Sequence, residues 1–298
     1  MKLTAIVLSH NEEMHIERCI ASILQVTPHV LVIDSFSTDK TVELATACGA
    51  MVLQHPFSTH ASQLNWGLGQ IPADSDWVLR VDADEYLDET LVESIRTQLP
   101  KAVVDGLYIK RRLIFQGRDI RHGMVYPVYI LRLFRRGKGR CIERLMDEHV
   151  QVEGLTATLP GTLYDHSLRS LSWWTAKHNR YASLEAIEQL NLKYHFLRPA
   201  TIGSEPAESK TLGFKRLLKQ QVYGRLPTGA RAFMYFFFRY VLALGFLDGK
   251  AGTAFHFLQG LWYRYLVDAK INEVERVMSR QQCDIRRAIE STLDVKLP

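Results

Sequence analysis

Cysteine is scarce in this chain and shows no paired spacing. The four cysteines form no C-x-x-C pair and no metal-ligand pattern; they are Cys19, Cys48, Cys141 and Cys283. This excludes a disulfide scaffold and a cysteine-rich zinc site. We expect the four cysteines to serve as small apolar side chains in a reducing compartment. The protein is therefore expected to be cytoplasmic.

Long hydrophobic runs are also absent. The apolar run in the N-terminal segment MKLTAIVLSHNEE has six residues, too few for a signal peptide, and fits a buried strand. In the aromatic second half, the uncharged stretches 232–238 and 240–247 have seven and eight residues. A bilayer-spanning helix needs roughly 20, so none is expected.

Charge divides the chain into two parts. Residues 1–160 hold 17 Lys or Arg against 20 Asp or Glu, and residues 161–298 hold 20 against 12. The basic part has no recognisable nucleic-acid reading motif. Its charges lie among aromatic and apolar residues, which favours an acidic membrane surface over nucleic acid as its partner.

Strands and helices alternate through the first hundred residues. Apolar strands are predicted in LTAIVLS, HVLVIDS, MVLQH and WVLRV, with helices near 16–24, 41–48 and 62–68 between them. This alternation predicts an α/β fold, a mainly parallel sheet flanked by helices. From residue 170 onward the pattern is helical.

Polar residues follow three of these strands. Ser9 to Glu12 come after the first strand, Asp34 after the second, and Asp82 and Asp84 after the fourth. Ligands of such sheets bind outside the carboxyl ends of the strands. Carboxylates suit magnesium or manganese, which take one or two of them plus diphosphate oxygens. A lone D-x-D is also typical of a solvated turn, but three converging strand ends favour a metal site.

Four segments carry a family resemblance. LSHNEEMHIERCIASI, VIDSFSTDKTVELA, QLNWG and VDADEYLDE resemble, in order and spacing, the family 2 inverting glycosyltransferases. The resemblance covers about residues 3–150 and implies the GT-A fold, with a nucleotide-sugar donor and a divalent metal, Mn²⁺ or Mg²⁺. Within the family, the segment IDSFSTDKT is most similar to lipopolysaccharide-core and exopolysaccharide enzymes of the WaaE type.

The resemblance also implies donor-site roles. Asp84 would ligate the metal and Asp82 would lie near the ribose or the metal. Nucleotide-sugar contacts are predicted for Ser9, Asn11, Glu12, Asp34, Gln63, Asp82 and Arg132. Asp34 has the alternative role of capping its loop, and Glu12 that of a first-turn helix acid. Asn65 is expected to pack a helix or hold a loop rather than contact the ligand.

Inverting transfer requires a base for the acceptor hydroxyl. The family carries an acid at a place comparable to Asp147-Glu148, and we favour Glu148, with Asp147 and a plain surface turn as alternatives. In the strand 129–136, Arg132 or Arg135 is suited to phosphate oxygens, and an exposed basic edge is the alternative.

Two domains are predicted, a catalytic domain at 1–168 and a helical extension at 169–298. The extension is expected to lie in the membrane interface, with Arg231, Arg239 and Arg264 reaching towards headgroups. Packing on the catalytic domain, or on a second copy in a homo-oligomer, is the alternative.

The resulting prediction is a metal-dependent glycosyltransferase that moves a hexose from a nucleotide-diphosphate sugar, with UDP favoured. Its acceptor would be lipid-linked or part of a lipopolysaccharide core or exopolysaccharide, at the cytoplasmic face of the inner membrane. A sugar nucleotidyltransferase is one alternative, although SHNEE replaces the Gly-rich, basic triphosphate loop such an enzyme needs. A peripheral membrane scaffold with a degenerate site is the other.

Overall fold

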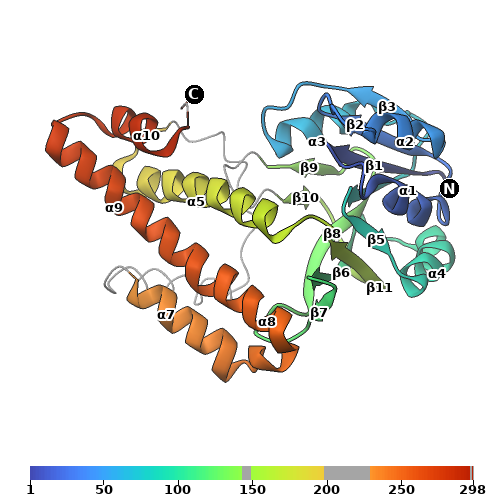
Figure 1. The fold of residues 1–298 in the computed structure, drawn as a ribbon. Helices are drawn as coiled ribbons and strands as arrows, with labels where there is room; N and C mark the ends of the chain where they lie inside the picture. The colour runs from blue at the N-terminus through green and yellow to red at the C-terminus, as the bar shows by residue number, and fades with distance from the viewer. Residues whose placement is uncertain (143–148, 198–228, 296, 298) are drawn as a thin grey trace. The chain divides into compact units, whose positions relative to one another are not determined.

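The computed structural model describes residues 1–142, 149–197, 229–295 and 297 of the chain. It divides into two compact units, Met1–Leu168 and Arg169–Pro298. The first unit is built on a sheet and the second on helices (Figure 1).

Within the described residues, the first unit contains a nine-stranded sheet with the order β3-β2-β1-β4-β8-β6-β11-β5, and β7 pairs with β6. The strands are β1 Leu3–Ser9, β2 Val30–Asp34, β3 Met51–Gln54, β4 Trp77–Asp82, β5 Glu85–Leu87, β6 Gly106–Phe115, β7 Arg118–Ile120, β8 Val128–Arg135 and β11 Thr156–His166. A separate pair is formed by β9 Gly139–Cys141 and β10 Val150–Val152.

The direction of the strands follows the connections. The strands β3, β2, β1 and β4 are parallel neighbours, joined by helices as the sequence predicts. Beyond β4, β8 runs antiparallel to both β4 and β6, while β6 and β11 are parallel. The sheet is therefore mixed, because the chain from β6 to β8 passes through the short strand β7 rather than through a helix.

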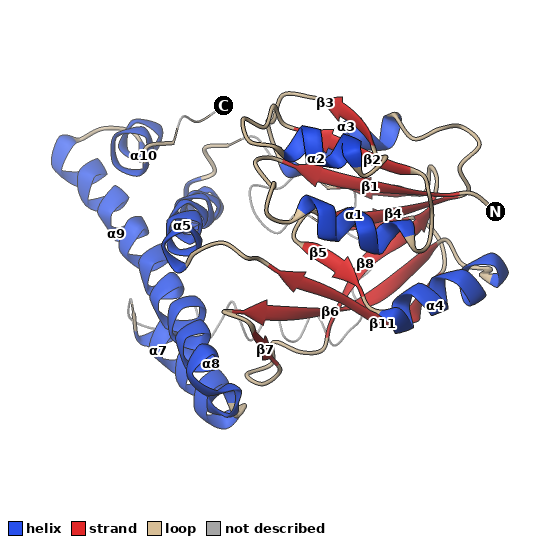
Figure 2. Cartoon of the chain, turned by 45° about the vertical axis from the view of Figure 1, so that its right-hand side comes forward, coloured by secondary structure: helices blue, strands red, loops and turns tan. Residues whose placement is uncertain are grey.

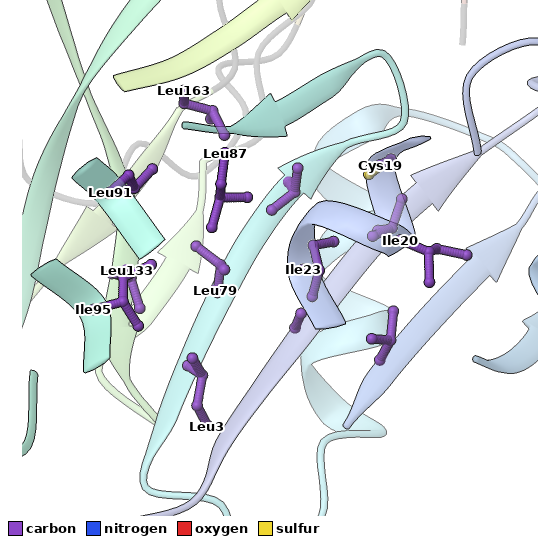
Figure 3. Close-up of a cluster of buried hydrophobic side chains, with 14 of the residues drawn as sticks. Leu3, Cys19, Ile20, Ile23, Leu79, Leu87, Leu91, Ile95, Leu133 and Leu163 are labelled. Atoms are coloured by element: carbon purple, nitrogen blue, oxygen red, sulfur yellow. The ribbon is translucent and has the colours of Figure 1, made fainter. Parts of the chain in front are cut away.

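Helices cover both faces of the parallel part. The helices of this unit are α1 Ile16–Leu24, α2 Thr41–Ala47, α3 His60–Gly69 and α4 Glu89–Gln98, followed by a 3₁₀ turn, Leu99–Lys101. Alternate residues of β1 point to opposite faces: Leu3 packs in one core cluster with Ile20 of α1 and Ile95 of α4 (Figure 3), and Ile6 packs in another with Leu64 of α3.

The approach of α3 to the sheet depends on a glycine. A Cβ on Gly67 would lie 2.6 Å from Ile6 Cδ1 and 2.8 Å from Ile33 Cγ1. A side chain there would overlap both isoleucines, so a glycine allows α3 to sit directly on β1 and β2.

The second unit is helical (Figure 2). Its α-helices are α5 Leu171–Tyr194, α7 Ala230–Phe237, α8 Gly249–Phe255, α9 Tyr263–Gln281 and α10 Ile285–Leu293. Between them lie π-helical segments at Phe238–Leu242 and His256–Trp262 and a 3₁₀ turn at Gly245–Asp248. Its core is formed chiefly by α5, α9 and α10, where Ile187, Val267 and Ile289 are buried together.

In the described part of the chain, no single helix has the length and apolar composition of a membrane span. One bent pair, Ala230–Leu242 with Gly245–Gln281, passes that test together and is bent by 70°.

The expected role of three arginines in this unit is wrong. Arg231 pairs with Asp268, Arg239 is buried and donates to Gln259, and Arg264 Nη1 lies 2.7 Å from Glu185 Oε1. Their guanidiniums are held by partners within the unit instead of extending to headgroups. The sequence shows that these arginines lie within apolar helices, but it does not show whether each one faces outward or pairs with an acceptor inside the unit. The tertiary structure supplies those partners.

Candidate active site at the strand ends

The carboxyl ends of β1, β2 and β4 lie side by side. Ser9 is the register partner of Asp34 across β1 and β2, and Leu8 is the partner of Asp82 across β1 and β4. The three polar strand ends predicted from the sequence therefore meet at one edge of the parallel sheet, because the parallel register leaves them no other arrangement.

Asp34 is buried and organises the loop that follows β2. Its carboxylate accepts hydrogen bonds from Ser9 Oγ at 3.1 Å, Ser37 N at 2.8 Å and Gln54 Nε2 at 3.2 Å. The capping role offered as an alternative is thus present in the structure. Contact of Asp34 with a nucleotide base stays a prediction.

The turn after β1 is tied to the same loop. Asn11 adopts φ 55° and its Oδ1 accepts from Thr38 N at 2.8 Å. Glu12 precedes α1, which begins at Ile16 with Glu17 as its first-turn acid, so the first-turn alternative for Glu12 is wrong. Instead its Oε2 lies 2.6 Å from His15 Nδ1.

His15 was not identified from the sequence. It is buried, and its Nε2 accepts a hydrogen bond from Leu168 N at 2.8 Å. Because Nε2 accepts, the proton of the neutral ring lies on Nδ1 and is donated to Glu12. Glu12 and His15 thereby connect the first strand end to the end of the first unit.

Gln63 and Asn65 both hold loops. Gln63 is buried in α3, and its Nε2 donates to Ser35 Oγ at 2.9 Å. Asn65 exchanges two hydrogen bonds of 2.9 Å with the backbone of Cys141, which confirms the loop-holding role expected for it. Contact of Gln63 with a diphosphate stays a prediction.

Arg132 is the centre of a buried charge cluster. One Nη2 atom donates to Asp82 Oδ2 and to Glu85 Oε1, both at 2.6 Å, and Arg80 Nη2 lies 3.2 Å from Asp82 Oδ1. Arg132 is 5% exposed and Glu85 is 1% exposed. The alternative of an exposed basic edge is wrong, because β8 lies between β4 and β6 inside the sheet.

The cluster shifts the pKa values of Asp82 and Glu85 in opposite directions. Burial opposes ionisation of Asp82, but Arg132 and Arg80 outweigh it and hold the pKa of Asp82 below its usual range. Burial and the charges of Asp82 and Asp165 raise the pKa of Glu85, although Arg132 opposes this. Despite its burial, the pKa of Arg132 is raised by the same two acids. Asp82 therefore remains an anion with a side chain about one-third exposed, 35%.

Asp84 occupies the turn between β4 and β5. Its backbone carbonyl accepts hydrogen bonds from Arg18 Nη2 at 3.2 Å and His166 N at 3.1 Å. Arg18 also donates to His166 O at 2.6 Å. Helix α1 and strand β11 thus fix the backbone that presents the Asp84 carboxylate.

Residues 4–147 match the protein family described as Glycosyl transferase family 2. These residues form a family 2 glycosyltransferase domain.

Curated proteins similar to this chain are also named as glycosyltransferases. This chain is 29% identical over 198 residues to the lipopolysaccharide core biosynthesis glycosyltransferase LpsC of Rhizobium meliloti, covering 64% of this chain and 72% of LpsC. An uncharacterised glycosyltransferase of Rickettsia typhi is 28% identical over 198 residues, covering 62% of this chain and 67% of that protein. One from Rickettsia bellii is 37% identical over 94 residues, covering 32% and 31%.

Solved structures to which this chain is similar include S. aureus TarS 1-349 in complex with UDP-GlcNAc. That match has 17% identity and a TM-score of 0.47, covering 99% of this chain and 92% of TarS 1-349. Glucosyl-3-phosphoglycerate synthase from Mycobacterium tuberculosis, solved with Mn²⁺ and UDP, has 24% identity and a TM-score of 0.30 over 38% of this chain and 44% of that chain.

Asp82 ends β4 and Asp84 follows it, and carboxylate oxygens of this kind are donors that magnesium and manganese accept. Among the described residues, no three His, Cys, Asp or Glu side chains are grouped to hold an ion. Both Asp82 oxygens are engaged by arginines. The role of Asp84 as the direct ligand stays a prediction. Magnesium and manganese sites of this kind use one or two carboxylates and complete their shell with substrate phosphates and water.

The predicted base lies outside the described residues. Both Glu148 and Asp147 fall in the segment 143–148, so their assignment stays a prediction. Sequence reasoning missed Glu85, Arg80, Arg18 and His15. The sequence did contain a signal for Glu85. It lies two residues before the apolar Leu87, and residues two apart on a strand point to the same face, so Glu85 could have been expected to face the core.

Proposed function

We propose that this protein is an inverting, metal-dependent glycosyltransferase that transfers a hexose from a UDP-sugar to a saccharide of a lipopolysaccharide core or another lipid-linked acceptor. The observation that carries the proposal is the pair Asp82 and Asp84 at the end of β4, beside the strand ends of Ser9 and Asp34. This is the edge where sheets of this kind bind their ligands. The name of LpsC supports the acceptor class.

The chain's own residues have distinct tasks in this scheme. Asp84, with Asp82 beside it, would hold Mn²⁺ or Mg²⁺, which when bound offsets the charge of the leaving diphosphate. Arg132 keeps Asp82 ionised and orients it from inside the sheet. Glu148, or Asp147 as the alternative, would take the proton from the acceptor hydroxyl that attacks the anomeric carbon, which then releases the nucleoside diphosphate from the opposite side.

The donor proposal is tested by thermal shift with nucleoside diphosphates and UDP-sugars, with and without manganese. A competent site raises the melting temperature when the ligand binds the folded state. We expect a manganese-dependent shift with one nucleotide in the wild type and none in Asp84→Ala. A wild type that shifts with no nucleotide would contradict the transferase site and favour the scaffold alternative.

The same proposal places the protein at the cytoplasmic face of the inner membrane. Its support is a cluster of exposed apolar side chains on the bent helix pair: Phe233, Met234, Phe237, Phe238, Val241, Leu242, Leu244, Phe246 and Leu247. The single acid between residues 229 and 265 is Asp248, which is buried. Apolar surface without exposed acids suits an anionic lipid interface.

Vesicle flotation tests this placement. We expect wild type to float with phosphatidylglycerol vesicles, and Phe237→Ser/Leu242→Ser to stay in solution because its apolar contact is reduced. Leu192→Ser, on the exposed side of α5 in the same unit, is the matched control and should float normally. Equal loss in the control would remove the support for this lipid-binding surface. A concentration-dependent dimer that Phe237→Ser/Leu242→Ser abolishes would favour a second copy of the chain over lipid.

A further inference from the structure

A row of tyrosine and arginine side chains crosses three neighbouring strands of the first unit. Tyr86 on β5, Tyr164 on β11 and Arg112 on β6 are register partners, so they share one face of the sheet. The rings of Tyr86 and Tyr164 stack with centroids 5.1 Å apart. Arg112 Nη1 donates to Tyr164 Oη at 3.0 Å, and its guanidinium lies 4.9 Å from the centre of the Tyr126 ring. We call Tyr86, Tyr164, Arg112 and Tyr126 the tyrosine–arginine row.

One end of the row is attached to the strand-end site. The Arg18 guanidinium lies 4.7 Å from the centre of the Tyr86 ring, and its Nη2 donates to the Asp84 carbonyl. Because β5, β11 and β6 are adjacent (Figure 2), the row extends from Asp84 across three strands, roughly 10 Å at the usual spacing. A ligand lying along it would have one end beside the donor carboxylates.

The row offers hydrogen-bond donors more than ring faces. The rings of Tyr86 and Tyr164 stack on each other, and the guanidiniums of Arg18 and Arg112 lie 4.7 Å and 5.6 Å from their respective centres, so a ligand is expected to meet hydroxyl and guanidinium N–H groups rather than open ring faces. All four side chains of the row are only partly buried.

The surrounding charge is strongly basic. Residues 106–126 contain five basic residues and one acid, Asp119, whose Oδ2 lies 2.9 Å from Arg121 Nη2 and whose Oδ1 lies 3.5 Å from Arg112 Nε. Lys110 Nζ lies 5.9 Å from the centre of the Tyr126 ring, at the far end of the row. An anionic ligand is therefore complementary to this face, and Arg112 provides a planar fork for its oxygens.

We propose that the tyrosine–arginine row binds an anionic saccharide acceptor. The tyrosine hydroxyls hydrogen-bond to sugar hydroxyls, and Arg112 with Lys110 pairs with a phosphate or carboxylate carried by that saccharide. The inference rests on the proposed transferase function and deepens it by assigning the chemistry of the acceptor. A row that only braces the sheet edge would stabilise the fold without affecting acceptor binding.

Calorimetric titration with two probes tests the proposal: a deacylated, phosphate-bearing core oligosaccharide, and the same oligosaccharide after phosphatase treatment. Losing a hydrogen bond to a charged group costs about 1.5–3 kcal/mol, so Arg112→Gln should weaken binding of the phosphorylated probe by roughly 10-fold or more. Tyr164→Phe keeps the ring and loses the hydroxyl, so it should weaken both probes by roughly 2- to 10-fold. A uronic-acid oligosaccharide as third probe distinguishes carboxylate from phosphate as the recognised group.

Arg118→Gln is the matched control, since it makes the same charge change on the exposed strand β7 outside the row. It should bind the probes within about 2-fold of the wild type, because an exposed charge away from the ligand contributes little. The manganese–UDP thermal shift, measured on every variant, reports an intact donor site. If that shift is normal while wild type binds none of the probes, or while Arg112→Gln and Arg118→Gln behave alike, the row is not the acceptor site and the transferase proposal is unaffected.

Discussion

Replacing Arg132 by methionine is the perturbation whose consequences the structure defines best. The variant leaves Glu85, 1% exposed, without the guanidinium that lies 2.6 Å from it. The Asp82 carboxylate loses less stabilisation, because its side chain is 35% exposed and its ion pair with Arg80 remains. Removing one partner of a buried ion pair lowers the free energy of unfolding by about 3–5 kcal/mol, and we expect nearly all of that loss to come from the ionised Glu85.

The loss should depend on pH. Burial already raises the folded-state pKa of Glu85 above its unfolded value, and removing Arg132 raises it further. The folded variant then binds a proton more tightly than the unfolded chain, so its stability falls as pH rises above the unfolded pKa of about 4.3. The pH-dependent part of the destabilisation relative to wild type is expected to be small below about pH 8, where both folded proteins hold Glu85 protonated, and to grow as pH rises above the wild-type folded-state pKa of about 8.

The assay is the urea dependence of amide hydrogen exchange in peptides from β4 and β8, which isolates the first unit from the helical one. Arg132→Met/Glu85→Gln should recover most of the lost stability, since it removes the buried charge. Arg135→Met is the matched control on the same strand; Arg135 donates to the carbonyls of Ala102 and Val104 and pairs with no carboxylate there. A loss below about 1 kcal/mol at a pH well above 8, or a loss that does not grow as pH rises past 8, would refute the reasoning about Glu85.

Three further predictions concern the donor site, the base and the helical unit. Asp84→Ala should abolish manganese-stimulated nucleotide binding in calorimetry, and unchanged manganese dependence would reject its role as ligand. Glu148→Gln should preserve donor binding but lower turnover by roughly 100-fold or more, whereas an active Glu148→Gln beside an inactive Asp147→Asn would move the base by one residue. Burial lowers the pKa of His178 to about 4, so the folded state disfavours its protonation and the stability of the helical unit should fall as pH drops from about 6.5 towards 4. The loss is on the order of 1 kcal/mol after discounting for partial exposure, and His178→Gln should remove this pH dependence if exchange in α5 is followed.

The parallel half of the sheet was predictable because its signals are local. Each βα step carries an apolar run and a helical period, and parallel register then brings the ends of β1, β2 and β4 together. The antiparallel half has no such signal, since β6, β8 and β11 pair over long sequence separations. Sequence spacing alone does not specify those partners.

Charged side chains show the same division between local and distant information. The sequence identified Arg132 as a residue suited to anions, yet its burial and its pairing with Asp82 and Glu85 depend on β8 lying against β4. Likewise, Arg231, Arg239 and Arg264 were interpreted as free to reach lipid, and tertiary partners hold them instead. An ion pair is a relation between two places in the fold, so neither residue reveals it by itself.

The sequence by itself determined the family 2 glycosyltransferase character of residues 4–147, the alternation that builds the parallel sheet and the acidic strand end at Asp82 and Asp84, because these depend on residue type and short-range spacing. Only the tertiary structure decided which carboxylate is exposed and which is buried, where Arg132 points, and that Tyr86, Tyr164 and Arg112 form one row. Burial and cross-strand contact arise from residues far apart in the chain, and they become defined only when the sheet is assembled.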